Sequence, residues 1–143
     1  MSISSDWVKA CSTALVDRLT NRVSLVHVLE QVPVPRLPAS LPSFHIVALW
    51  HNNLDMAVDA RLRIDVEEQG GETSSVLSEE SITFAGRVNH RTICIVHAMT
   101  VLRGGSYRVV ARYQMAGTDR WIDGASHPFQ VQVVAAPSES AQA

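Results

Sequence analysis

Six histidines are the side chains in this sequence best suited to hold a metal ion or to move a proton near neutral pH. They are spread along the chain, at His27, His45, His51, His90, His97 and His127. His45 and His51 share one strand parity, but six residues of extended chain place them about 20 Å apart, too far to bind one ion. The others can meet only through tertiary folding, and we expect His97, on an apolar face, to be a hydrogen-bonded core residue.

Motifs for nucleophilic, phosphate and zinc chemistry are missing from the sequence. Gly104-Gly105-Ser106-Tyr107-Arg108 lacks the last glycine of a nucleophile elbow, and neither Gly-Gly pair has the flanking Gly and Lys of a phosphate loop. There is no His-Glu-x-x-His or Cys-x-x-Cys pair either. We therefore expect no catalytic residue, no cofactor and no bound metal.

One catalytic alternative stays open, a small-molecule or metal-dependent sensor or enzyme whose site is built from scattered His and Asp residues. A deep polar pocket that contains three or more candidate side chains would favour it. These candidates are His27, His45, His51, His97 and Asp17.

Residues 57–68 alternate apolar and charged side chains, which predicts a strand with one face in the core and the other in water. The inward set is Val58, Ala60, Leu62, Ile64 and Val66, and the outward set is Asp59, Arg61, Arg63, Asp65 and Glu67. Arg108 and Arg112 would extend the arginines into a basic stripe if their strand lay alongside, but the carboxylates would blunt it. With a net charge of −2, we expect no nucleic-acid partner.

The start of the chain and its cysteines indicate a compartment. Residues 1–6 have no basic start, no apolar run follows, and no stretch reaches the ~20 apolar residues of a membrane span. Cys11 and Cys94 stand alone and far apart, which predicts two buried free thiols in a reducing environment. We expect a cytoplasmic protein with no membrane partner.

Two long apolar stretches within residues 91–115 are joined across Arg103-Gly104-Gly105-Ser106. Both faces of the first are largely apolar, as in a strand deep in a sheet. The second alternates and begins at Tyr107. The order Leu102-x-x-Gly105-x-Tyr107-x-Val109 resembles the corner before the sixth strand of immunoglobulin-like sandwiches, where a Tyr hydroxyl bonds upstream backbone. An ordinary hairpin with a buried tyrosine is the alternative.

Turn residues separate further strand-like segments at residues 23–32, 43–51, 57–68, 74–84 and 127–134. Residues 5–19 fit both a helix, through the spacing of Trp7, Cys11, Leu15 and Leu19, and a strand. Four prolines make residues 33–42 an extended loop or crossover. The pattern predicts an all-β, antiparallel two-sheet sandwich of seven to nine strands. We place it at residues 7–135, between an N-terminal tail (1–6) and a flexible C-terminal tail (136–143).

Two stretches of the sequence resemble a family of small bacterial cytoplasmic proteins classed as a domain of unknown function. The first is residues 10–30, with the proline loop and residues 44–50 after it; the second is residues 90–93 with residues 105–109. The order of these motifs carries the resemblance, which spans residues 7–134. It implies an immunoglobulin-like β-sandwich and a strand, not a helix, at residues 10–17. It supplies no catalytic residues.

Two features suit a protein partner or a second copy of the chain. The proline loop would hold Val34, Arg36, Leu37 and Leu41 on a stiff segment that loses little entropy on binding. Residues 74–84 are predicted to form an edge strand open to strand addition. Alternatively, the apolar loop residues simply cap one end of the sandwich. The leading hypothesis is a non-catalytic binding or assembly module; a viral or host-defence accessory role has no feature for or against it.

Overall fold

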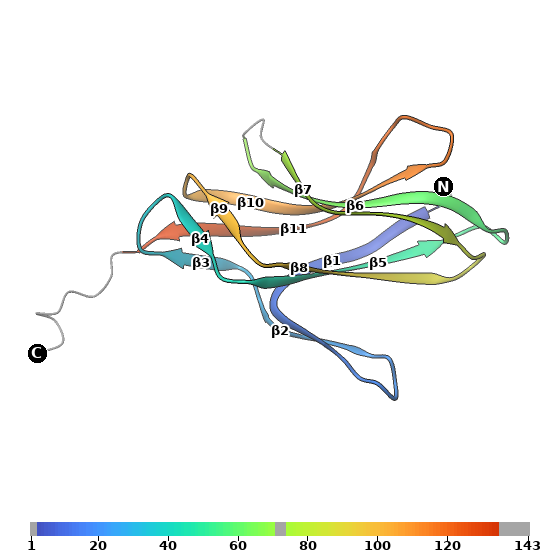
Figure 1. Cartoon of the computed structure of the whole chain (residues 1–143), viewed down its shortest axis with the longest axis horizontal. Helices are drawn as coiled ribbons and strands as arrows, with labels where there is room; N and C mark the ends of the chain where they lie inside the picture. The colour runs from blue at the N-terminus through green and yellow to red at the C-terminus, as the bar shows by residue number, and fades with distance from the viewer. Residues whose placement is uncertain (1–2, 71–73, 135–143) are drawn as a thin grey trace, which may run out of the picture.

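The computed structural model describes residues 3–70 and 74–134, and these form a β-sandwich with no helix (Figure 1). One sheet, here sheet A, has the strand order β2-β1-β5-β8; the other, sheet B, has the order β3-β11-β10-β6-β7; a short pair, β4-β9, joins two of the connections. The strands are β1 (Ile3–Val16), β2 (Val23–Val28), β3 (Gln31–Val34), β4 (Ala39–Leu41), β5 (Phe44–Asn52), β6 (Val58–Glu68), β7 (Ser74–Phe84), β8 (Asn89–Val96), β9 (Met99–Val101), β10 (Gly105–Met115) and β11 (Ile122–Val133).

The core lies between the inward faces of the two sheets. Alternation along each strand turns every second side chain inward, and these side chains are apolar on both sheets. The largest fully buried ones include Trp50 and Ile46 of β5, Leu62 of β6 and Phe129 of β11. Burying a side chain of this size contributes roughly 1.5–3 kcal/mol. The inward set predicted for residues 57–68 is confirmed, with Ala60, Leu62, Ile64 and Val66 buried and Val58 half-buried.

A polar chain crosses from one sheet to the other along one side of the sandwich. The indole N–H of Trp50 donates to the Thr92 hydroxyl oxygen at 3.1 Å. That hydroxyl donates to Glu80 on β7 at 2.7 Å, and His90 lies 3.0 Å from the same carboxylate. Because β8 and β7 belong to different sheets, these bonds close the seam between them.

Two expectations, about the N-terminal end and the strand count, need correction. Residues 3–6, expected in an N-terminal tail, belong to β1, where Ile3 pairs with Asn52 of β5 and its side chain is fully buried in the core. The described residues form eleven strands, not seven to nine. The tail expected at 136–143 lies outside the described residues. The strand predicted for residues 10–17 is confirmed up to Val16.

The strand expected at residues 23–32 is two strands in different sheets. His27 has a positive φ of 53°, yet the chain stays in the sheet A ladder through Val28, which pairs with Cys11, and leaves it after Leu29. The chain then enters sheet B as β3, which pairs with β11 in the parallel direction. The sandwich is therefore not purely antiparallel as expected. Beyond β3, the proline segment carries a cis peptide bond between Leu37 and Pro38 and returns as β4.

The stretch at residues 91–115 differs from its expected form in its first half. β8 lies at the edge of sheet A, not deep within it, and Ile93 and Ile95 are 40% and 49% exposed. β8 and β10 are in different sheets, so the segment between them is not a hairpin. The Tyr107 hydroxyl donates to the carbonyl oxygen of Arg103 at 2.6 Å, as a tyrosine corner requires.

Replacing Tyr107 with Phe should therefore lower the free energy of unfolding by about 1 kcal/mol, because the Arg103 carbonyl loses its donor. Urea unfolding followed by tryptophan fluorescence would measure the change. Tyr113→Phe is the matched control: Tyr113 is equally buried, and its hydroxyl has no hydrogen-bond partner among the described residues. Equal effects of the two substitutions would show that the corner bond contributes nothing specific.

Candidate functional site

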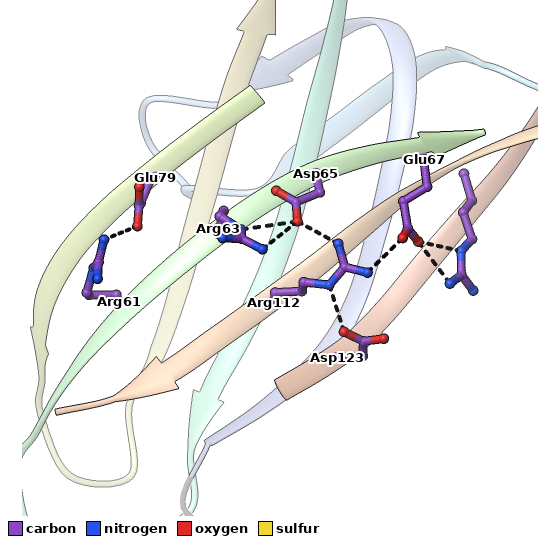
Figure 2. Close-up of polar contacts among 8 residues, drawn as sticks. Arg61, Arg63, Asp65, Glu67, Glu79, Arg112 and Asp123 are labelled. Carbon is purple, nitrogen blue, oxygen red and sulfur yellow. Dashed lines mark hydrogen bonds and ion pairs between the residues drawn. The ribbon is translucent and has the colours of Figure 1, made fainter. Parts of the chain in front are cut away.

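The outer face of sheet B carries a row of charged side chains from β6 and β10, which are neighbours (Figure 2). The register places Arg108 opposite Glu67, and Arg112 opposite Arg63. The four arginines do share one face, as the sequence allowed, and each is paired. Arg112 bonds Asp65 at 2.5 Å, Glu67 at 3.0 Å and Asp123 at 2.7 Å. The remaining pairs are Arg63–Asp65, Arg108–Glu67 and Arg61–Glu79.

This face is not the fully solvated surface that alternation predicted. Asp65 is completely buried, and the Arg112 side chain is only 11% exposed. Trp121, in the loop between β10 and β11, packs over two of the guanidiniums: its ring centre lies 4.2 Å from Arg63 and 5.3 Å from Arg61. Such cation–π contacts strengthen when desolvated. The aromatic side chain thus covers charges that the sequence pattern assigned to water.

The paired charges shift the proton affinities of their partners. Burial works to raise the pKa of Glu67, but hydrogen bonds and charge from Arg112 and Arg108 outweigh it and hold this pKa below its ordinary value. Burial would likewise lower the pKa of Arg112, yet its bonds to Asp123, Asp65 and Glu67 raise it further above the physiological range. Arg112 is therefore a permanent cation, and Glu67 stays ionised well into the acid range.

The scattered histidines and Asp17 do not converge. Within residues 3–70 and 74–134, no group of three or more His, Cys, Asp or Glu side chains could hold a metal ion. His45 Nδ1 accepts the backbone N–H of Ala14 at 2.8 Å, His51 contacts Asn89 at 2.7 Å, and His97 is exposed, so it is not the core residue expected. Asp17 caps a turn by accepting the N–H groups of Thr20 and Leu19, which lowers its pKa.

His127 is the one deeply buried histidine of the described chain. Burial lowers its pKa, so the ring is neutral at pH 7. Its Nε2–H donates to the carbonyl oxygen of Leu29 at 2.7 Å, which fixes the tautomer, while Nδ1 is sealed from solvent without a partner. The sequence assigned His127 no role, because its partners could be found only through tertiary folding.

The four residues proposed as a partner contact lie mostly inside the protein. Val34 and Leu41 are buried in the core, and Leu37 is half-buried against it. Of the four, Arg36 alone is exposed. This burial agrees with the alternative stated for the proline loop, in which its apolar side chains cap one end of the sandwich, because β3 and β4 draw the segment into the strand ladders. The edge position expected for β7 is confirmed.

A hairpin made by the far half of β1 and by β2 extends below sheet A (Figure 1); we call residues 12–28 the arm. The turn of the arm reaches β8, the strand at the opposite edge of sheet A from β2. There Arg91 donates to the carbonyl oxygen of Asn21 at 2.6 Å and to the side-chain oxygen of Asn21 at 3.2 Å. The bond between Ala14 and His45 holds the arm near its root. The arm therefore lies across the outer face of sheet A.

The arm and the face beneath it expose apolar side chains. Along one row, the register runs from Val28 through Cys11 and His45 to Ile95, and Ile93 occupies the next row on β8. Seven large apolar residues of the arm and β8 are exposed, with Leu15 at 55% and Leu19 at 96%; the others are Val16, Val26, Val28, Ile93 and Ile95. No sequence pattern indicated this surface, because the same residues fit a buried strand.

Both cysteines are free and buried, as predicted. Burial raises the pKa of each thiol from its ordinary value. A raised pKa leaves less thiolate at neutral pH, so neither side chain is activated as a nucleophile.

No protein-family model and no curated protein matches this sequence. Among solved structures, a β-glucosidase from Listeria innocua in complex with glucose superimposes on 92% of this chain with a TM-score of 0.50 and 10% identity. A variant of that enzyme in complex with laminaribiose gives 0.51 over 92% at 10% identity, and a β-glucosidase from Erythrobacter marinus gives 0.51 over 92% at 6%. The chain spans 17%, 17% and 15% of these three enzymes, so the likeness concerns the fold of a part of each. The described residues contain no helix able to cross a membrane.

Arg112→Met should lower the free energy of unfolding by about 3 kcal/mol, because it leaves the buried Asp65 carboxylate with Arg63 as its one cation. Arg108→Met is the control: that side chain is 47% exposed and pairs with Glu67 alone, so the expected loss is about 1 kcal/mol or less. Denaturant midpoints of both variants test the difference. If both variants lost a similar free energy of unfolding, burial of the ion-pair network would add nothing to the stability of the protein.

The lowered pKa of Glu67 predicts acid sensitivity. A carboxylate whose folded pKa is depressed contributes stability above its unfolded pKa, near 4.5, and loses that contribution as the pH falls through the folded value. The free energy of unfolding should therefore drop below about pH 4.5, and less steeply in Glu67→Gln. Urea titrations at a series of pH values would reveal this; parallel curves for the two proteins would exclude Glu67 as a contributor.

Proposed function

We propose that this chain is a non-catalytic, cytoplasmic β-sandwich with immunoglobulin-like topology that binds a protein partner or a second copy of itself. The non-catalytic part rests on the sequence, which carries none of the nucleophile, phosphate or metal motifs. The binding part rests on one observation, the exposed apolar surface of the arm and β8.

The strand order supports the immunoglobulin-like part of the proposal. The neighbours β11-β10-β6-β7 follow the G-F-C-C′ order of a variable-type immunoglobulin sheet, and β5-β8 correspond to the B–E pair of the opposite sheet. In this correspondence Tyr107 stands at the start of strand F, where the tyrosine corner belongs. The arm is an addition to that plan, inserted between the first and second strands.

The chemistry of the arm supports a protein contact. Scattered apolar residues are ordinary on a protein surface, whereas a contiguous group marks an interaction site. Here Val28 of the arm shares a register row with Ile95 of β8, and Ile93 lies on the same face. The edge of β8 is also unpaired within the described chain. A partner could therefore cover apolar side chains and add backbone hydrogen bonds at one place.

Replacing Leu15 and Ile95 together with Ser should abolish self-association or partner capture while leaving the fold intact, because both side chains are about half exposed. Sedimentation velocity over a range of concentrations would measure self-association. Mass spectrometry of complexes purified from the native host would measure partner capture. Val76→Ser is the matched control, since Val76 is 55% exposed, as Leu15 is, but lies on β7.

A double variant that retains every partner and the native oligomeric state would exclude the arm and β8 as the contact. A wild-type protein that stays monomeric at all concentrations and carries no stoichiometric partner would overturn the proposal itself.

A further inference from the structure

A polar groove of about 460 Å³ lies over β6, β7 and the end of β10, bounded by the turn that follows β10. It is on the outer side of sheet B, on the opposite sheet from the arm, so a ligand bound there would be independent of a partner bound at the arm. Its volume falls within the range of small-molecule sites, roughly 300–1,000 Å³. Six polar side chains line it: Asp59, Arg61, Ser81, Thr83, Gln114 and Thr118.

The strand register arranges these side chains in two adjacent rows. Gln114, Arg61 and Ser81 lie opposite one another on β10, β6 and β7. Asp59 and Thr83 form the next row, and the Thr83 hydroxyl donates to Asp59 at 2.7 Å. The groove is thus a platform of three neighbouring strands, with carboxylate, guanidinium, amide and hydroxyl groups side by side.

Gln114 is the group that marks this groove as a binding site. Its side chain is more than nine-tenths buried, and its oxygen accepts from Arg61 Nη1 at 3.1 Å. Its amide nitrogen, with two N–H donors, has no acceptor in the described part of the chain. That nitrogen is not among the polar atoms sealed from solvent, so it opens into the groove that Gln114 lines.

The floor of the groove is held in place before any ligand arrives. Arg61 is fixed from three sides, by Gln114, by an ion pair with Glu79 and by the ring of Trp121. A side chain already held in one geometry loses little entropy when a ligand binds. The donors of Gln114 and the acceptor oxygens of Asp59 are therefore presented on a rigid surface.

Arg61, the one guanidinium of the lining, is already neutralised by its ion pair with Glu79, so the carboxylate of Asp59 is the uncompensated charge of the groove. An anionic ligand is therefore disfavoured at this site. A sugar hydroxyl donates one hydrogen bond and accepts others, so a pair of neighbouring hydroxyls matches a carboxylate acceptor beside an amide donor. We propose that this groove binds a neutral saccharide through Asp59, Arg61, Ser81 and Gln114.

Two-dimensional ¹H–¹⁵N NMR of the full-length protein tests the proposal, because the side-chain NH₂ of Gln114 gives its own signals, assigned by their loss in Gln114→Met. The probes are cellobiose, maltose and lactose, each added separately, with sodium sulfate as an anionic comparison. At least one disaccharide should shift the Gln114 NH₂ and the Ser81 amide saturably. Ser81→Ala should weaken binding about fivefold, the effect of one hydrogen bond. Ser75→Ala, at the far end of β7, should leave it unchanged.

Failure of all three sugars to shift these signals would overturn the proposal, as would sulfate shifting them instead. Shifts confined to other parts of the protein would also overturn it. If Gln114→Met does not fold, the exposed positions Asp59→Asn and Ser81→Ala carry the test, and unchanged affinity in both would reject the assigned residues.

Discussion

The two sheets of this protein stay together because each turns one apolar face toward the other. Trp50, Phe129 and Leu62 fill the space between them, and no other apolar layer of comparable burial is present in the described chain. This apolar contact fixes which face of each strand points outward. Because the apolar residues of β6 and β10 point into the core, their charged residues lie on the opposite face, where they form the ion-pair network and line the groove. The seam through Thr92 and Glu80 then ties the sheet edges.

The network on sheet B illustrates how a surface can acquire core-like properties. A three-stranded platform places Arg112 among three carboxylates, and the covering Trp121 excludes water from part of the cluster. Coulomb attraction strengthens as the local dielectric falls, but the cost of desolvating Asp65 rises with it. The second carboxylate oxygen of Asp65 is buried without a partner, so part of its desolvation cost is not offset.

Local pattern predicted the all-β class, the strand at residues 57–68 and the edge position of β7, because each depends on alternation within one segment. Prediction from local pattern failed where burial or pairing depends on segments that are distant in the sequence. The two apolar faces of β8 indicated a buried strand, yet nothing pairs with its outer edge in the described chain. Asp65 looked solvated, since Trp121 lies far away in sequence. The groove was likewise invisible, because Gln114 gains its neighbours only through strand register.

The two buried thiols are native probes of local opening in this protein, because each can be labelled only when it becomes accessible. Cys11 lies on the outer face of sheet A near the root of the arm, and Cys94 faces the carbonyl oxygen of Leu77 across the seam between β8 and β7. A thiol sealed in the closed state reacts only when its surroundings open. The labelling rate of Cys11 would therefore report local opening at the root of the arm, and that of Cys94 local opening at the seam between β8 and β7. Local opening at two places in one domain can be followed separately without introducing a probe.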